Sequence, residues 1–196
     1  VVLHMGAVEM KDYTDKLVDL VGEGQREAPK YQKLCEEAES KREGRKERHV
    51  ELAYDLLRRI VEVADRHQIM LGIENREALE EIPFESDFAF FFQEFNSPLV
   101  RYWHDTGHAQ IKENIGFINH VFHLESMAPN LAGFHIHDVQ FPGRDHCPPG
   151  SGMIDFAALK PFVKPEHIKV FELNPGMSVE DLQSGVAHIK SLWGGE

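Results

Sequence analysis

The chain has 196 residues, of which 42% are apolar, enough for a folded domain rather than a disordered polypeptide. Its formal net charge of -12 argues against a nucleic-acid partner, because phosphate binding rests on clustered Lys and Arg. The apolar runs are far shorter than the roughly 18 residues of a membrane span, so we expect neither a membrane span nor a cleavable signal. Two widely separated cysteines, Cys35 and Cys147, are typical of a reducing compartment, and we expect a cytoplasmic location.

Short apolar runs predict five β-strands, and helical patterns lie between them. The runs are 1-VVLH-4, 69-IMLGIEN-75, 99-LVRYWHD-105, 131-LAGFHIHDV-139 and 168-IKVFELN-174. They are apolar on both faces, as expected for parallel strands that helices cover. The alternation of strands and helices predicts parallel βαβ units and an α/β fold.

The clearest helical pattern covers residues 49–67, where apolar residues recur at steps of three and four. A second helix is predicted over 84–95, capped by Ser86, and a third over 111–127.

Two further helix starts are marked by capping residues. Asp155 is predicted to cap a helix over 156–162, and Ser178, with Asp181 three residues on, opens the last helix. Residues 22–48 are rich in both acids and bases, and we interpret them as a charged helical insertion into a single domain over residues 1–196. A partner surface is the alternative for this segment.

Ionisable residues stand at the carboxyl end of every predicted strand: His4, Glu74, Arg76, Asp105, His108, His135, His137 and Glu172. In a parallel barrel these ends converge on one face, where active sites are built. His135 and His137 share a strand face, because alternate side chains point the same way. Isolated buried charges are costly unless they are paired or bind a metal, so the pattern favours a divalent cation held by carboxylates and imidazole.

The loop 143-GRDHCPPGSGMIDF-156 contains a further histidine, and its function is open between two interpretations. Gly150 and Gly152 allow a tight backbone, from which His146 could reach into the site. The loop could equally be a turn that leads to the cap at Asp155.

Taken together, these residues resemble the xylose isomerase-like TIM-barrel superfamily. The matching segments are 1-VVLHMG-6, 72-GIENRE-77, 105-DTGH-108, 135-HIHD-138, 150-GSGMIDF-156 and 171-FELNPG-176, in the order of the family. The resemblance implies an incomplete (β/α)8 TIM barrel of about five βα units, which begins at the fourth strand of the family barrel. Open sheet edges would favour pairing with another chain, so a homo-oligomer is possible.

The resemblance also implies the residues of the site. One divalent metal ion, Mn, Mg, Co, Zn or Fe, would be held by Glu74, Asp105, His135 and Glu172. Glu74 and Glu172 would also move the substrate proton as catalytic residues. Residues expected to bind substrate are His4, His108, His137, His146 and Arg76.

The leading functional hypothesis is a metal-dependent isomerase or epimerase of a small sugar or sugar-like hydroxy-ketone, acting by proton transfer through an enediolate. One alternative is a lyase, a dehydratase or a phosphodiester hydrolase at the same metal. Another is a non-catalytic truncated barrel. The endonuclease branch of the superfamily carries an Asp where this chain has Arg144, which argues against the hydrolase.

Overall fold

The computed structural model describes residues 1–95 and 97–194, and these form two compact units, Val1–Trp103 and His104–Glu196. Within the described ranges, no helix combines the length and the apolar character that crossing a membrane requires.

The first unit contains parallel strands that match three of the predicted runs. They are β1 (Val2–Leu3), β2 (Leu71–Glu74) and β3 (Val100–Asp105), whose last two residues belong to the second unit. Leu3 lies opposite Ile73 in the register, and Glu74 lies opposite Trp103. All four residues of β2 are buried, as its continuous apolar run predicts.

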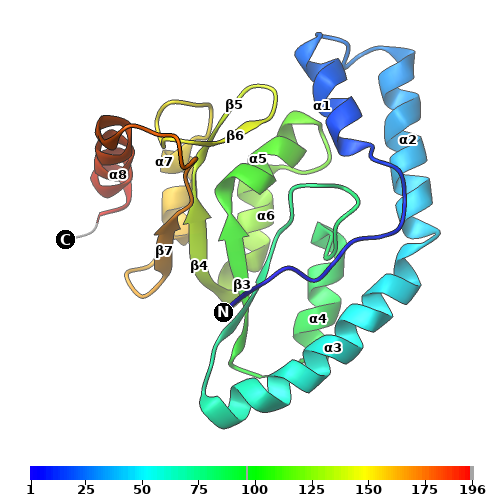
Figure 1. The fold of residues 1–196 in the computed structure, drawn as a ribbon, viewed down its shortest axis with the longest axis vertical. Helices are drawn as coiled ribbons and strands as arrows, with labels where there is room; N and C mark the ends of the chain where they lie inside the picture. Colours follow the sequence, from blue (N-terminus) through cyan, green and yellow to red (C-terminus); the bar gives the residue numbers. More distant parts are fainter. Residues whose placement is uncertain (96, 195–196) are drawn as a thin grey trace. The chain divides into compact units, whose positions relative to one another are not determined.

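Helices of the first unit are α1 (Thr14–Gly22), α2 (Pro29–Glu43), α3 (Lys46–His67) and α4 (Phe88–Glu94). Figure 1 shows α1 and α2 beside each other, followed by the long α3. The helix predicted over 49–67 is confirmed as α3, which buries Ala53, Leu57 and Ala64 along one face. Most of the charged stretch 22–48 is helical, because it contains α2 and the start of α3.

The predicted Ser86 cap is wrong. A 3-10 turn over Glu85–Asp87 precedes α4, whose N-cap residue is Asp87. Its Oδ2 accepts a hydrogen bond from the Phe84 N–H at 3.0 Å, and its Oδ1 pairs with Lys46 Nζ at 2.8 Å. Asp87 therefore ties the start of α4 to α3, a tertiary contact that the local sequence does not reveal.

Strands of the second unit form a parallel pair and a hairpin: β4 (Leu131–Ile136) with β7 (Ile168–Phe171), and β5 (Asp138–Gln140) with β6 (Arg144–Cys147). His135 lies opposite Val170 in the parallel pair. The strand predicted over 131–139 therefore ends at Ile136, and its last residues begin the antiparallel hairpin that sequence analysis missed (Figure 1).

Helices of the second unit are α5 (Thr106–Asn114), α6 (His120–Met127), α7 (Phe156–Leu159) and α8 (Val179–Trp193). The prediction of a single helix over 111–127 is wrong. The chain turns at Gly116, whose φ is +73°, and the second helix begins after its N-cap, Asn119. The Asn119 side chain accepts a hydrogen bond from the Phe122 N–H at 2.9 Å. The caps at Asp155 and Ser178 are confirmed by hydrogen bonds from Ala158 N–H and Asp181 N–H, at 3.0 and 3.1 Å.

The fold is α/β, with five parallel strands in the described residues alternating with helices, and corresponds to an incomplete (β/α)8 barrel.

Aromatic packing attaches the last helix to the second unit. The Trp193 ring lies 5.2 Å from that of Phe134, and its Nε1 donates to the Phe156 carbonyl at 2.7 Å. This packing holds α8 beside α7 and β4.

Two buried histidines face each other in the second unit. The Nε2 atoms of His104 and His120 lie 2.9 Å apart, and Gln110 Oε1 lies 3.3 Å from His120 Nδ1. Burial, reinforced by the neighbouring histidines, lowers the pKa of His120 to about 3 and that of His104 well below its ordinary value. Both rings are therefore neutral at pH 7.

We expect the free energy of unfolding to fall as the pH is lowered from about 6.5 towards 3. The unfolded chain takes up protons on His120 near pH 6.5, whereas the folded chain does so only near pH 3. The stabilisation that His120 contributes is therefore fully present above pH 6.5 and is lost progressively as the pH falls below it. Its size is about 1.4 kcal/mol for each unit by which the pKa differs between the folded and the unfolded chain. Chemical denaturation across this pH range measures the slope, which His120→Gln should flatten. The exposed His67→Gln is the control, and an equal slope in wild type and H120Q would contradict the assignment.

Candidate metal centre

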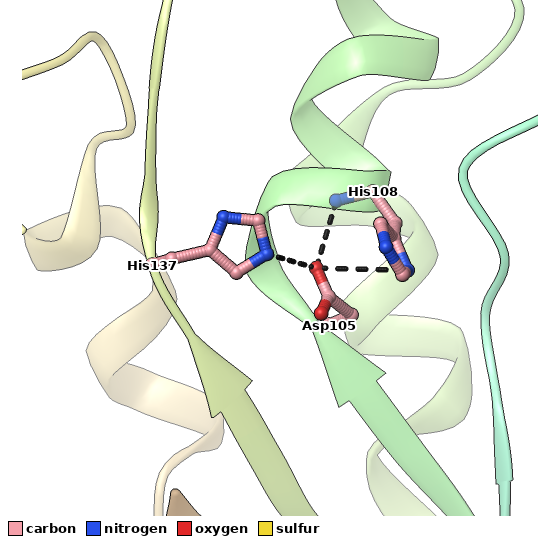
Figure 2. A group of neighbouring side chains, drawn as sticks. All are labelled: Asp105, His108 and His137. Atoms are coloured by element: carbon pink, nitrogen blue, oxygen red, sulfur yellow. Dashed lines mark hydrogen bonds and ion pairs between the residues drawn. The ribbon is translucent and has the colours of Figure 1, made fainter. Parts of the chain in front are cut away.

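Asp105 is the centre of the site, and its two carboxylate oxygens face different groups. It is the last residue of β3 and the N-cap of α5, and it is fully buried. Oδ1 accepts a hydrogen bond from the His108 N–H at 2.8 Å and lies 3.0 Å from His137 Nε2 (Figure 2). Oδ2 lies 3.8 Å from His135 Nδ1. The local sequence thus places one carboxylate at a strand end where it both caps a helix and faces β4.

A second pair of potential ligands meets the Oδ2 side of this carboxylate. His135 Nδ1, from β4, lies 2.9 Å from Oε2 of Glu172, the residue that follows β7. Potential ligand atoms of Asp105, His135 and Glu172 all lie within 4.8 Å of one another. The solvent exposure of these side chains differs: Asp105 is buried, whereas the side chain of Glu172 is 46% exposed. These three predicted ligands therefore come together on the second unit, with one of them open to a substrate.

Charge in the site is balanced by imidazoles. Burial alone would raise the pKa of the Asp105 carboxyl, but His108 and His137 outweigh it and hold that pKa well below its ordinary range. Burial likewise lowers the pKa of His137, and the Asp105 carboxylate more than reverses this. Asp105 is thus ionised at neutral pH, as a metal ligand must be.

His146 reaches the site from the β5–β6 hairpin. Its ring stacks on that of His137, with centroids 4.3 Å apart and an angle of 5° between the planes. Its Nδ1 pairs with Asp145 Oδ2 at 2.8 Å, and this hydrogen bond raises the pKa of His146. Its φ of +51° is rare for a residue with a side chain, and such backbone is concentrated at functional sites.

Asp138 organises the loop beside the site, and sequence analysis did not assign it a role. Its buried carboxylate accepts hydrogen bonds from the N–H groups of Val139, Gly150, Gly152 and Ile154, at 2.8, 2.8, 2.9 and 3.1 Å. The sequence pattern that could have indicated this role is a carboxylate near the end of a predicted strand, followed by a glycine-rich loop. The loop is thus fixed to the start of β5 by one side chain.

Three of the predicted site residues lie in the first unit. Glu74, at the end of β2, is 1% exposed. His4 Nε2 lies 3.1 Å from its Oε2, and the Arg76 guanidinium also pairs with it. Arg76 makes a second ion pair, with Glu81 at 3.0 Å. These three residues therefore contact one another, and their roles in metal and substrate binding stay predictions.

The donor set of the second unit fits a divalent cation. One imidazole nitrogen and two carboxylates suit Mn, Mg, Zn, Co or Fe, and no thiolate takes part. A carboxylate in a protein interior is costly unless it is neutralised by partners or a cation. Asp105, His135 and Glu172 could therefore hold the metal, while His108 and His137 contact the Oδ1 oxygen of the Asp105 carboxylate (Figure 2).

A model of the xylose isomerase-like TIM barrel family matches residues 28–191. The chain belongs to this family, which confirms the resemblance seen in the sequence. A search of curated proteins found no match.

Solved structures of similar fold include 3-keto-D-glucoside 4-epimerase from E. coli, which is 19% identical with a TM-score of 0.58 over 73% of this chain and 54% of the other. D-psicose 3-epimerase with D-tagatose from Clostridium cellulolyticum H10 is 14% identical, with a TM-score of 0.56 over 74% and 56%. The IOLI protein with a zinc atom bound is 18% identical, with a TM-score of 0.55 over 72% and 56%. The chain thus spans about half the length of these proteins, and the likeness is one of fold.

Replacing Gly152 with Ala should release the loop that Asp138 holds. A Cβ at this position would collide with the Val139 carbonyl and the Asp138 carboxylate. We expect a loss of about 1–3 kcal/mol in the free energy of unfolding and faster amide hydrogen exchange over 150–154. Gly176→Ala is the matched control, because its Cβ would meet only Asn174 Oδ1 at 3.5 Å. Unchanged exchange in G152A would show that Asp138 does not restrain the loop.

Proposed function

We propose that the protein is a divalent-metal-dependent isomerase or epimerase of a small sugar or sugar-like hydroxy-ketone. The observation that supports this most directly is the convergence of Asp105, His135 and Glu172 from successive strand ends of the second unit. Family membership supports the same proposal, and so do the epimerases among the structures of similar fold.

Glu172 is proposed as the residue that moves the proton. Its carboxylate is half-exposed, whereas that of Asp105 is fully buried, so Glu172 is the ligand that a substrate carbon can approach. A carboxylate base within hydrogen-bond reach of an acidified C–H is the usual requirement for such a transfer. A bound divalent cation would polarise the carbonyl and a neighbouring hydroxyl of the substrate, which acidifies that C–H.

Glu74 is proposed as the fourth ligand and as the second base. This follows from the family resemblance, in which two glutamates flank the reacting carbon. In the first unit, its burial and its pairing with Arg76 and His4 hold its carboxylate in one orientation. With one base the proton would return to an adjacent carbon, giving isomerisation, and with two opposed bases the configuration would invert. We propose His4, Arg76, His108 and His146 as contacts to substrate hydroxyls.

The substrate class is proposed as a ketose or a keto-sugar. Two of the proteins of similar fold bear names that contain such sugars, D-psicose and 3-keto-D-glucoside. Imidazole and carboxylate side chains around the centre are suited to binding several hydroxyl groups, as a polyhydroxy compound requires.

Deuterium wash-in from heavy water tests the reaction. Metal-free protein supplied with Mn or Co should exchange the carbon-bound proton of at least one ketose in a panel, and a chelator should stop the exchange. Glu172→Gln should slow exchange about 10²- to 10⁴-fold, the usual contribution of a general base. The exposed Glu166→Gln is the matched control and should exchange as wild type does. Unchanged exchange in both E172Q and E74Q would overturn the proposal, and water loss seen by mass spectrometry would favour a dehydratase.

A further inference from the structure

His137 contacts Oδ1 of Asp105, whereas His135 faces Oδ2, and both ring nitrogens of His137 have neighbours. The residue is fully buried. Its Nδ1 accepts a hydrogen bond from the backbone N–H of His146 at 2.9 Å, and its Nε2 lies 3.0 Å from Asp105 Oδ1 (Figure 2). Distance alone would allow Asp105, His108 and His137 to form a second metal site, since their ligand atoms also lie within 4.8 Å of one another.

The hydrogen bond from the His146 N–H determines whether Nε2 of His137 can bind a metal ion or instead carries a proton. A nitrogen that accepts a hydrogen bond carries no proton, so Nδ1 of His137 is unprotonated and the ring proton is on Nε2. A neutral histidine that bound a metal through Nε2 would need its proton on Nδ1, where it would clash with the His146 N–H. Nε2 therefore presents an N–H to Asp105 rather than a lone pair to a cation.

The surrounding residues fix the ring in this orientation. The Thr106 hydroxyl donates to the His137 carbonyl at 2.7 Å and accepts from the His137 N–H at 3.1 Å. A Cβ on Gly107 would collide with the His137 ring, so the ring lies directly against the backbone of Gly107. The His146 ring stacks close to the His137 ring as well. Each residue of 105-DTGH-108 thus contacts either His137 or the carboxylate that His137 faces.

Nε2 of His137 makes a close ion-pair contact with Oδ1 of Asp105 at 3.0 Å, without hydrogen-bond geometry in the structure.

We propose that His137 is a positioning residue: its Nε2–H holds Oδ1 of Asp105, so that Oδ2 is directed to a single metal at His135 and Glu172. This rests on the proposed metal site and extends it, because it assigns the two oxygens different tasks and excludes a second metal at His108 and His137. It also accounts for a histidine at this position, where any apolar residue would fill the space but would leave the carboxylate unsupported.

The tautomer can be observed directly in the wild-type protein. NMR of protein labelled with ¹⁵N-histidine should show His137 with an unprotonated Nδ1 and a protonated Nε2, both before and after addition of diamagnetic Zn²⁺. Calorimetric titration with Mn²⁺ should give one tight site per chain. A proton on Nδ1, or two tight sites of which His137→Leu removes one, would overturn the proposal.

Variants separate positioning from packing. His137→Leu should weaken Mn²⁺ binding about 10- to 100-fold, the usual effect of losing a hydrogen-bond partner of a metal ligand. His137→Gln, whose amide N–H can reach the same oxygen, should restore most of the affinity. His167→Leu is the matched control, since this buried histidine also accepts a backbone N–H, that of Lys164, at 3.1 Å, and packs against Phe134. Equal Mn²⁺ affinity in wild type and H137L would contradict the role.

These outcomes are distinguishable from failure of the proposed reaction. Metal affinity, stoichiometry and the tautomer are measured without any substrate, so they hold or fail whatever the result of deuterium exchange. If H137L does not fold, the wild-type NMR spectrum still decides the matter. Gly107→Ala gives a further check, because its methyl group should displace the ring and reproduce the loss of affinity.

Discussion

The site depends on one buried carboxylate that divides its two oxygens between two sets of partners. Asp105 is completely removed from water, and an isolated charge at such a position would be strongly destabilising. One oxygen is satisfied by the His108 N–H and faces His137, while the other faces His135 and Glu172. This division makes the carboxylate rigid, ionised and directed, which are the properties that a metal ligand needs.

The same constraint explains why short motifs far apart in the sequence interlock. The segment 105–108 supplies the carboxylate, a hydroxyl that hydrogen-bonds to the backbone of His137, and a glycine whose missing side chain leaves space for the His137 ring. The segment 135–138 supplies an imidazole for the proposed metal, an imidazole for Asp105 and, in Asp138, the carboxylate that fixes the following loop. Metal ligation, orientation of the ligand and ordering of the loop are thus carried by a few adjacent residues on each strand end.

Much of this was predictable from the sequence, because strand ends in parallel βα units converge and alternate residues share a face. That reasoning located Asp105, His135 and Glu172, and the cap at Ser178 is set by a local hydrogen bond. Other features depend on contacts between distant residues. The role of Asp87 involves Lys46, and the break at Gly116 divides what reads as one helix. The tautomer of His137 follows from a backbone N–H nine residues away, which periodicity cannot reveal.

The central claim is that Asp105, His135 and Glu172 hold a single divalent cation on the second unit. Anomalous diffraction from crystals of the protein grown with Mn²⁺ tests it most directly. The account predicts one strong peak in contact with Asp105 Oδ2, His135 Nδ1 and Glu172 Oε2. The absence of a peak there, or a peak seated between His108 and His137, would contradict it.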